Sequence, residues 1–596
     1  MVVIAAGVLL AVLLTDGGDE EQVYSVEQLS DRYWTWRLDD SPEFATYLGN
    51  HERDDRLESY SLASWARREE DMKGFLADIQ RINVTELSEA DKENLDILKE
   101  EIELFVEGIQ YKGFYFPVNF LEGVQVDFVT LITQFMPLNT VADYNNVLAR
   151  YAAFGKQVDE IIEVMRKGIE EKITFPKESM KGIQEQFEAL ETNPEDSLFY
   201  EPFLQMNESL ITNESIAELQ SRGLTAVTDQ MLPALNKLKE FILNDYMSNL
   251  RDNIACYSLP NGEAMYKQLI RYHIGWDMLP SEIHDIGMDE VKRIKDQMQI
   301  IIDRLGFPDK ATFDEYLINN ETFYYEKEED ILDAYRHIVY NRIEPKLLTW
   351  FKKLPKQPVL VEAAPASQPF APQAYYQLGT IDRPGVFTVN VADPKNQPAY
   401  SMVSLSLHEA QPGHHTQAAL SAEDTTLHAS RRTFDDRRYG EAPSKFPIYT
   451  AYGEGWGLYA ERLGEDIGVY ENDYEQYGRY LDEMLRACRL VVDTGMHALN
   501  WTRQDAMDFL FENMGDESEN SIDRYITWPG QALAYKIGEL KINDVRKYAE
   551  SELGAKFNIK EFHDIFLTLG PGNLERFESA INEYVEQNKA RSISLL

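Results

Sequence analysis

The chain of 596 residues is poor in cysteine, with Cys256 and Cys488 as the only two. A fold that depends on a disulfide framework is therefore excluded, and the two thiols could either pair or stay buried and free. Basic residues are also scarce: 58 Lys and Arg stand against 102 Asp and Glu, which gives a formal net charge of −44. Because such a surface repels phosphate, nucleic acid is excluded as a partner.

Long hydrophobic runs are missing as well. The apolar run Val2–Leu14 is shorter than the ~20 residues of a comfortable membrane-spanning helix, and an acidic spacer follows it. The run is typical of a signal peptide or a short signal-anchor, although it lacks a basic start and a small-residue cleavage site. We therefore expect residues 1–22 to be an apolar signal or anchor segment with its spacer, and the protein to be secreted or held by a single N-terminal membrane anchor.

N-glycosylation triplets give weak support to export, because they also occur by chance. They begin at Asn83, Asn207, Asn213, Asn320 and Asn500.

Helical periodicity dominates residues 25–350, where apolar residues recur at three- and four-residue spacing. The ranges with this pattern are Asp71–Ile82, Glu89–Phe105, Val141–Ile169, Ile216–Asn249 and Met288–Leu305. Between residues 353 and 400 prolines interrupt the pattern, and Val386–Val391 alternates like a strand. We predict a mainly α fold with a small strand edge, built as one domain over residues 23–596 or as two lobes of about 23–350 and 351–596.

Three of the ten histidines fall in the stretch His408-Glu409-Ala410-Gln411-Pro412-Gly413-His414-His415. Zinc hydrolases place two imidazoles on the metal and a glutamate beside its water, usually as H-E-x-x-H on one helix. Here Pro412 stands where the second histidine would be, so the motif is expanded. Proline and glycine can widen a turn of the expected helix Ser401–Leu420. We prefer His414 as the second ligand and keep His415 as the alternative.

The third ligand is expected from a later helix. Glu454 lies in Tyr452-Gly453-Glu454-Gly455-Trp456, a block whose glycines allow close helix approach and whose aromatic residues could wall a site. Together the two blocks predict a metal site for one zinc ion, with Glu409 as the general base that deprotonates water.

These blocks, together with Trp528-Pro529-Gly530-Gln531-Ala532-Leu533-Ala534-Tyr535, resemble the family called domain of unknown function 885. The resemblance extends to most of residues 25–590 through Leu259-Pro260-Asn261-Gly262, Leu279-Pro280-Ser281-Glu282 and Arg383-Pro384-Gly385. That family is grouped with gluzincin-type metallopeptidases, in which two histidines and a glutamate bind zinc. The resemblance implies a large helical metallopeptidase fold and a zinc site, but no particular substrate.

Further residues are candidates for supporting roles. His497 and Tyr535 could donate hydrogen bonds to an oxyanion, or could be a capping histidine and a core tyrosine. Asp493 or Glu461 could orient a ligand imidazole. The strand Val386–Val391 could pair with the main chain of a substrate or form a plain structural hairpin.

Candidate anchors for a substrate carboxylate are also present. Lys536, Arg546 and Arg503 could take that role, and the cluster Arg431, Arg432, Arg437 and Arg438 could do so too, although internal salt bridges are the commoner use of such a cluster. Acidic residues at the site could instead hold a free amine, as in an aminopeptidase.

We therefore predict a zinc-dependent hydrolase of short or unfolded peptides, exopeptidase-like as a carboxypeptidase or dipeptidase. The alternatives are a non-peptide amidase or other metal hydrolase, an Fe(II) enzyme with the same ligand set, or a catalytically inactive extracellular binding protein.

Overall fold

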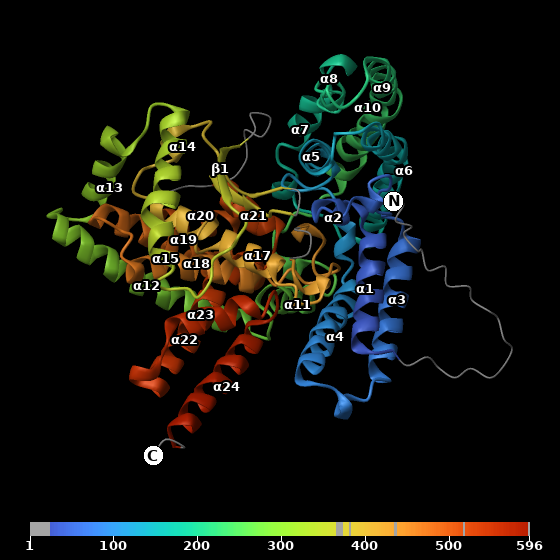
Figure 1. Ribbon diagram of the computed structural model, residues 1–596. Helices are drawn as coiled ribbons and strands as arrows, with labels where there is room; N and C mark the ends of the chain where they lie inside the picture. Colours follow the sequence, from blue (N-terminus) through green and yellow to red (C-terminus); the bar gives the residue numbers. More distant parts are fainter. Residues whose placement is uncertain (1–23, 365–372, 381–382, 434–437, 516–518, 594–596) are drawn as a thin grey trace.

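Helices make up most of the protein, as expected. The computed structural model (Figure 1) describes residues 24–364, 373–380, 383–433, 438–515 and 519–593. The described strands form a single three-stranded sheet, so the prediction of a mainly α fold with a small strand edge is confirmed. The described helices include none long and apolar enough to cross a membrane. The run Val2–Leu14 and its spacer lie outside the described residues.

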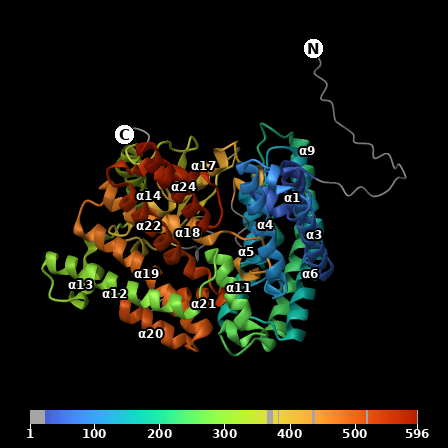
Figure 2. The ribbon, with the colours of Figure 1, turned by 90° about the horizontal axis from the view of Figure 1, so that it is seen from below.

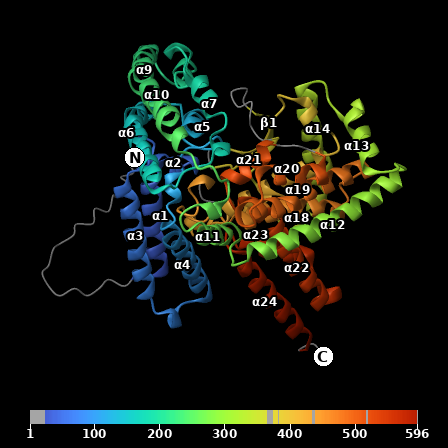
Figure 3. The same cartoon turned by 180° about the vertical axis from the view of Figure 1, so that it is seen from behind.

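The helices of the first half gather on one side of the molecule, as Figures 1 and 3 show from opposite directions. Apart from the short helix Pro42–Tyr47, whose Phe44 and Ala45 pack with Leu38 in a small cluster of their own, their apolar faces share one hydrophobic core. They are α1 Val26–Asp40, α2 Pro42–Tyr47, α3 Leu62–Gln80, α4 Glu89–Ile109, α5 Val124–Thr130, α6 Val141–Glu171, α7 Ile183–Leu190, α8 Glu201–Leu204, α9 Asn213–Ala226, α10 Leu232–Phe241 and α11 Gly262–Ile274.

The later helices form the other side, with α22 and α24 running toward the C-terminus (Figure 1), and Figure 2 shows the same division from below. They are α12 Pro280–Leu305, α13 Lys310–Asn319, α14 Glu328–His337, α15 Glu344–Leu347, α16 Met402–Glu409, α17 His414–Glu423, α18 Thr450–Ile467, α19 Asp473–Ala498, α20 Arg503–Met514, α21 Glu519–Thr527, α22 Ala534–Leu553, α23 Ile559–Thr568 and α24 Leu574–Ile593. The single domain and the alternative division into two lobes near residue 350 both stay predictions. Helix α12, which precedes that boundary in the chain, packs along α19, which follows it.

The sheet has the strand order β1-β3-β2, with β1 Val359–Ala363, β2 Ala374–Gln377 and β3 Gly385–Val389. β3 pairs in parallel with β1 and antiparallel with β2, and all five of its residues are buried. The strand predicted at Val386–Val391 is therefore the central one. Because both of its edges are already hydrogen-bonded, the idea that this strand pairs with a substrate main chain is wrong.

The helix expected over Ser401–Leu420 is broken into α16 and α17. Pro412 has no N–H to continue the ladder, and a Cβ on Gly413 would lie 1.8 Å from the carbonyl oxygen of His408. The indole of Trp456 donates to the carbonyl of Pro412 at 2.9 Å and holds the connection in place. The predicted widened turn is thus a full interruption, after which α17 starts with a new helical phase at His414.

Helices α18 and α22 touch through their backbones. A Cβ on Gly538 would lie 2.5 Å from the carbonyl oxygen of Ala451 and 2.8 Å from the Cα of Gly455. Only glycine permits so short a distance between the two helices.

Cys256 and Cys488 are both buried and free. Of the two alternatives for this pair, the free thiols are the one observed.

Replacing Gly538 with alanine should lower the free energy of unfolding by about 1–3 kcal/mol, because the added methyl group overpacks the contact between α18 and α22. Urea denaturation followed by circular dichroism measures the change. Gly155→Ala in α6 is the matched control, since a Cβ there meets nothing within 4 Å. We expect it to be neutral or to stabilise by up to about 1 kcal/mol through helix propensity. Equal effects of the two substitutions would contradict the close contact.

Candidate metal centre

His408, near the end of α16, is held by two carboxylates from α18. Its Nδ1 lies 2.7 Å from Oε1 of Glu461, and its Nε2 lies 3.4 Å from Oε2 of Glu454. Glu454 and Glu461 stand two turns apart on one face of α18, because positions i and i+7 of a helix nearly coincide in direction. The imidazole is 3 % exposed, so this side chain has one fixed orientation.

Gly457 makes room for the imidazole between the two glutamates. A Cβ at this position would lie 2.7–2.9 Å from three atoms of the His408 ring. The face of α18 that meets α16 thus carries Glu454, Gly457 and Glu461 in turn, and the glycine leaves the space that the His408 ring occupies.

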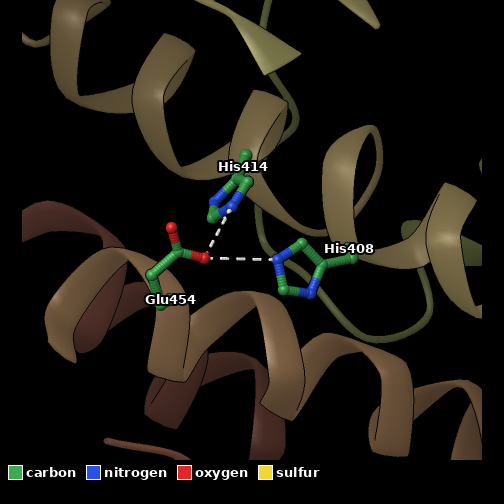
Figure 4. Close-up of side chains that lie close together, drawn as sticks. All are labelled: His408, His414 and Glu454. Atoms are coloured by element: carbon green, nitrogen blue, oxygen red, sulfur yellow. Dashed lines mark hydrogen bonds and ion pairs between the residues drawn. The ribbon is translucent and has the colours of Figure 1, made fainter. Parts of the chain in front are cut away.

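His414 completes the cluster from the first turn of α17. Its Nε2 lies 3.3 Å from the same Oε2 of Glu454 that faces His408, as the dashed lines in Figure 4 show. The rings of His408 and His414 are 4.7 Å apart and nearly perpendicular. The three residues offer ligand atoms that all lie within 4.8 Å of one another.

The spacing of these atoms suits a zinc ion. Ligand atoms about 2.0–2.1 Å from zinc in tetrahedral geometry lie roughly 3.3 Å apart, and the two nitrogen-to-oxygen distances are 3.3 and 3.4 Å. Donation from Nδ1 of His408 to Glu461 would leave the Nε2 lone pair directed at the centre of the cluster. The donor set and its orienting carboxylate therefore fit a zinc site.

The electrostatics of the cluster show how strongly it favours a cation. Burial would lower the pKa of His408, but the carboxylates of Glu454 and Glu461 raise it to about 10. Burial opposes ionisation of Glu454 too, yet the two histidines hold its pKa well below the usual range. Without a metal, the imidazole of His408 therefore holds an extra proton at neutral pH, next to the carboxylates of Glu454 and Glu461.

His415, the alternative ligand, is directed elsewhere. Its Nδ1 lies 3.2 Å from the hydroxyl of Tyr376, and its Nε2 lies 3.1 Å from the carbonyl oxygen of Gln357. Burial lowers its pKa to about 4, so the ring is neutral. His415 thus ties α17 to the sheet, and the structure brings His414 rather than His415 to the cluster.

Glu409, the expected general base, is buried at the end of α16 next to His408. Its carboxylate is close enough to contribute to the raised pKa of His408. The carboxylate of Glu409 thus lies beside the cluster, and neither His408 nor His414 is hydrogen-bonded to it.

His497 does not join the cluster. Its Nδ1 accepts from the backbone N–H of Cys256 at 3.1 Å, and its Nε2 lies 2.9 Å from the carbonyl oxygen of Tyr525. Because both ring nitrogens bond to backbone, the assignment of His497 as an oxyanion donor is wrong, and its role is to join α19 to neighbouring segments. Asp493 likewise bonds to Tyr266 and Gly530, so of the two candidates only Glu461 contacts an imidazole of the cluster, that of His408.

Tyr535 lies beside His408, with the two rings 6.5 Å apart and inclined by 22°. Its hydroxyl accepts from Nη2 of Arg524 at 3.1 Å and from Nε2 of Gln531 at 3.4 Å. Since both neighbours donate, the phenolic proton of Tyr535 is left to donate in another direction.

A cavity opens at the cluster and has a tyrosine-rich wall. His414 and Glu454 line it together with Tyr47, Tyr376, Tyr439 and Tyr449, and with the apolar residues Leu378, Ala418 and Ile448. Tyr47, Tyr376, Tyr439 and Tyr449 all lie outside the two motif blocks, and no local signal in the sequence marks them as wall residues.

The segment that carries Tyr439 is fixed by the first half of the chain. Glu122 accepts from the backbone N–H groups of Tyr439 and Gly440, and burial raises its pKa to about 8. Arg438, in the same segment, forms an ion pair with Glu58 at 2.5 Å. Both halves of the molecule therefore shape the cavity.

The proposed carboxylate anchors are used internally. Lys536 pairs with Glu290, Glu483 and Glu539, Arg546 with Asp466 and Glu550, and Arg503 with Asp523 and Glu519. In the basic cluster, Arg431 and Arg438 form ion pairs and Arg432 donates to backbone carbonyls, while Arg437 lies outside the described residues. The expectation of internal pairing is thus the one observed.

Two solved structures share the architecture over almost their whole lengths. A putative lipoprotein from Colwellia psychrerythraea is 27 % identical, with a TM-score of 0.85 over 95 % of this chain and 100 % of that one. A putative lipoprotein of unknown function from Shewanella oneidensis is 18 % identical, with a TM-score of 0.67 over 94 % and 99 %, and shows the fold alone. No curated protein matches the chain. The model of the bacterial proteins of unknown function called DUF885 matches residues 42–581, and the chain belongs to that family.

Proposed function

We propose that the protein is a zinc-dependent peptidase that hydrolyses short or unfolded peptides. The observation that carries this proposal is the convergence of His408, His414 and Glu454 on one point, with Glu409 adjacent in the chain. The ligand set and the neighbouring glutamate are those that gluzincin-type metallopeptidases use, which supports the relationship that the sequence motifs suggest.

A zinc ion held by the three side chains would supply Lewis-acid chemistry that makes water nucleophilic near neutral pH. Glu409 takes a proton from the water as its oxygen adds to the peptide carbonyl carbon. Tyr535 donates its phenolic proton as a hydrogen bond to the carbonyl oxygen as negative charge develops there. The C–N bond then breaks, and the proton held by Glu409 passes to the leaving amine.

The tyrosine-lined cavity sets the class of substrate. The cavity lies between the two halves of the chain, has a volume of about 30 Å³ and includes a wall segment fixed by Glu122, which leaves no room for a folded protein. We therefore propose exopeptidase-like cleavage. The likeness to two putative lipoproteins supports a place in the cell envelope or outside the cell.

His414→Ala should abolish stoichiometric zinc binding, because it removes one of three ligands. Elemental analysis of dialysed protein measures the zinc content, with circular dichroism to confirm folding. His415→Ala is the matched control and should keep about one zinc per chain. Loss of zinc in the His415 variant alone would reverse the assignment of the second ligand.

Glu461→Gln should weaken zinc binding by about 10–100-fold, because the carboxylate that orients His408 is replaced by a neutral amide. Competition with a chromophoric chelator measures the affinity. Glu465→Gln, on the same helix and paired with Arg479, serves as the control and should leave the affinity unchanged. An unaltered affinity in the Glu461 variant would show that this contact does not tune the metal.

Glu409→Gln should reduce peptide cleavage by about 10²–10⁴-fold while zinc content stays the same, because the variant keeps the ligands and loses the base. Mass spectrometry of a mixed peptide library, incubated with wild type and variant, measures the cuts and their distance from each end. An unchanged rate in the variant would remove Glu409 from the mechanism. A folded, zinc-loaded wild type that cuts no peptide would overturn the peptidase proposal in favour of a non-peptide amidase or a binding role.

A further inference from the structure

Two arginines converge on Tyr535 beside the metal cluster. Arg489, on α19, places its guanidinium carbon 4.5 Å from the centre of the Tyr535 ring. Arg524, on α21, donates to the Tyr535 hydroxyl at 3.1 Å. Since the Tyr535 ring is itself 6.5 Å from that of His408, both guanidinium groups belong to the surroundings of the cluster.

Neither arginine forms an ion pair with any residue that the structure describes. Their neighbours do: Arg486, one turn before Arg489, pairs with Asp482 at 3.0 Å, and Lys536, next to Tyr535, pairs with three glutamates. In a chain with 102 acidic residues, a guanidinium as buried as that of Arg489 is costly without a carboxylate, because burial removes its hydration without replacing it.

The hydrogen-bonding capacity of the two arginines is only partly used. Arg489 is 7 % exposed and donates through Nε to the hydroxyl of Tyr525, while its buried Nη1 has no partner. Arg524 donates through Nη2 to Gln531 and Tyr535, while its buried Nε has none. The indole nitrogen of Trp528, whose ring lies 5.1 Å from the guanidinium of Arg524, is also without a partner.

All three unused groups are donors, so their natural complement is an acceptor with negative charge. A carboxylate accepts two parallel hydrogen bonds from one guanidinium, and such charge-assisted pairs are the strong ones.

The arginines connect with the cavity through a continuous aromatic wall. Trp528 packs on Tyr439 with ring centres 5.0 Å apart, and Tyr439 lines the cavity with His414 and Glu454. Neither arginine lines the cavity itself; the pair lies one aromatic layer behind its wall, next to Tyr535 and the cluster.

We propose that Arg489 and Arg524 form an anion subsite that receives the terminal carboxylate of a peptide substrate. This inference rests on the proposed peptidase function and narrows it to cleavage near a free C-terminus. The subsite takes the place of the anchors at Lys536, Arg546 and Arg503, whose charges are already neutralised by internal carboxylates.

The test compares acetyl-Ala-Ala-Phe with a free carboxylate and the same peptide as its C-terminal amide. Calorimetric titration into zinc-loaded Glu409→Gln protein measures binding without cleavage. We expect the acid to bind roughly 10–100-fold more tightly than the amide, as hydrogen bonds to a charged group allow. Arg489→Met and Arg524→Met, added singly to Glu409→Gln, should each weaken binding of the acid toward that of the amide and leave the amide unchanged.

Matched controls separate the subsite from general effects. Arg503→Met removes an arginine that is already paired and should keep the preference for the acid. If a methionine variant does not fold, Arg489→Lys or Arg524→Lys keeps the charge without the guanidinium fork and should show an intermediate preference. Equal binding of acid and amide to the parent protein, or a preference that survives both arginine substitutions, would overturn the subsite.

Three further outcomes have distinct meanings. Tighter binding of an amidated phosphoserine peptide than of the free acid would overturn the assignment to a carboxylate. Arginine-dependent binding of the acid in a wild-type protein that cuts no peptide would uphold the subsite and overturn the peptidase. Glu409-dependent cleavage by a protein that shows no preference for the acid would uphold the peptidase and overturn the subsite.

Discussion

The site depends on one buried imidazole held between two carboxylates of a single helix. Glu454 and Glu461 face the two nitrogens of His408, and Gly457 leaves the space that the ring fills. The other faces of α18 are committed as well: Gly455 touches α22 through backbone, and Trp456 holds the connection between α16 and α17. Because these faces of α18 have fixed partners, α16 has one position in which His408 fits. His414 is then placed by the short connection that follows.

Much of this could be predicted from the sequence, because the residues of the cluster lie in two short blocks with strong local signals. The helices of the first half were visible in their apolar periodicity, and the strand at β3 in its alternation. The local signals do not decide between His414 and His415. The choice depends on the helical phase, that is, on which of the two adjacent side chains the helix turns toward the cluster. A continuous helix would put His415 on the face of His408, but the interruption at Pro412 and Gly413 restarts the helix and turns His414 inward.

Other features depend on partners distant in the chain, so no local pattern reports them. His497 is a site candidate in the sequence because it follows the cluster residues along the chain, yet its ring bonds to the backbone of Cys256 and Tyr525. The central position of β3 depends on β1 and β2, whose sequences carry a weaker strand signal than that of β3. The sequence does not distinguish Arg489 and Arg524 from other arginines, because only the fold determines which arginines have a carboxylate within ion-pair distance. In so acidic a protein, an arginine without a carboxylate is informative only in three dimensions.

The cavity wall joins residues that are made at very different times. Tyr47 leaves the ribosome several hundred residues before Glu454, which at 5–20 residues per second is a delay on the order of tens of seconds. The hydrophobic core of the first half also contains Phe446, Ile448 and Leu533 from later in the chain, so this core too is completed only after that interval. A chain that stops before α18 carries two imidazoles and neither of their carboxylates. The cluster of two histidines and a glutamate and the wall of the cavity are thus both completed only after α18 has been made.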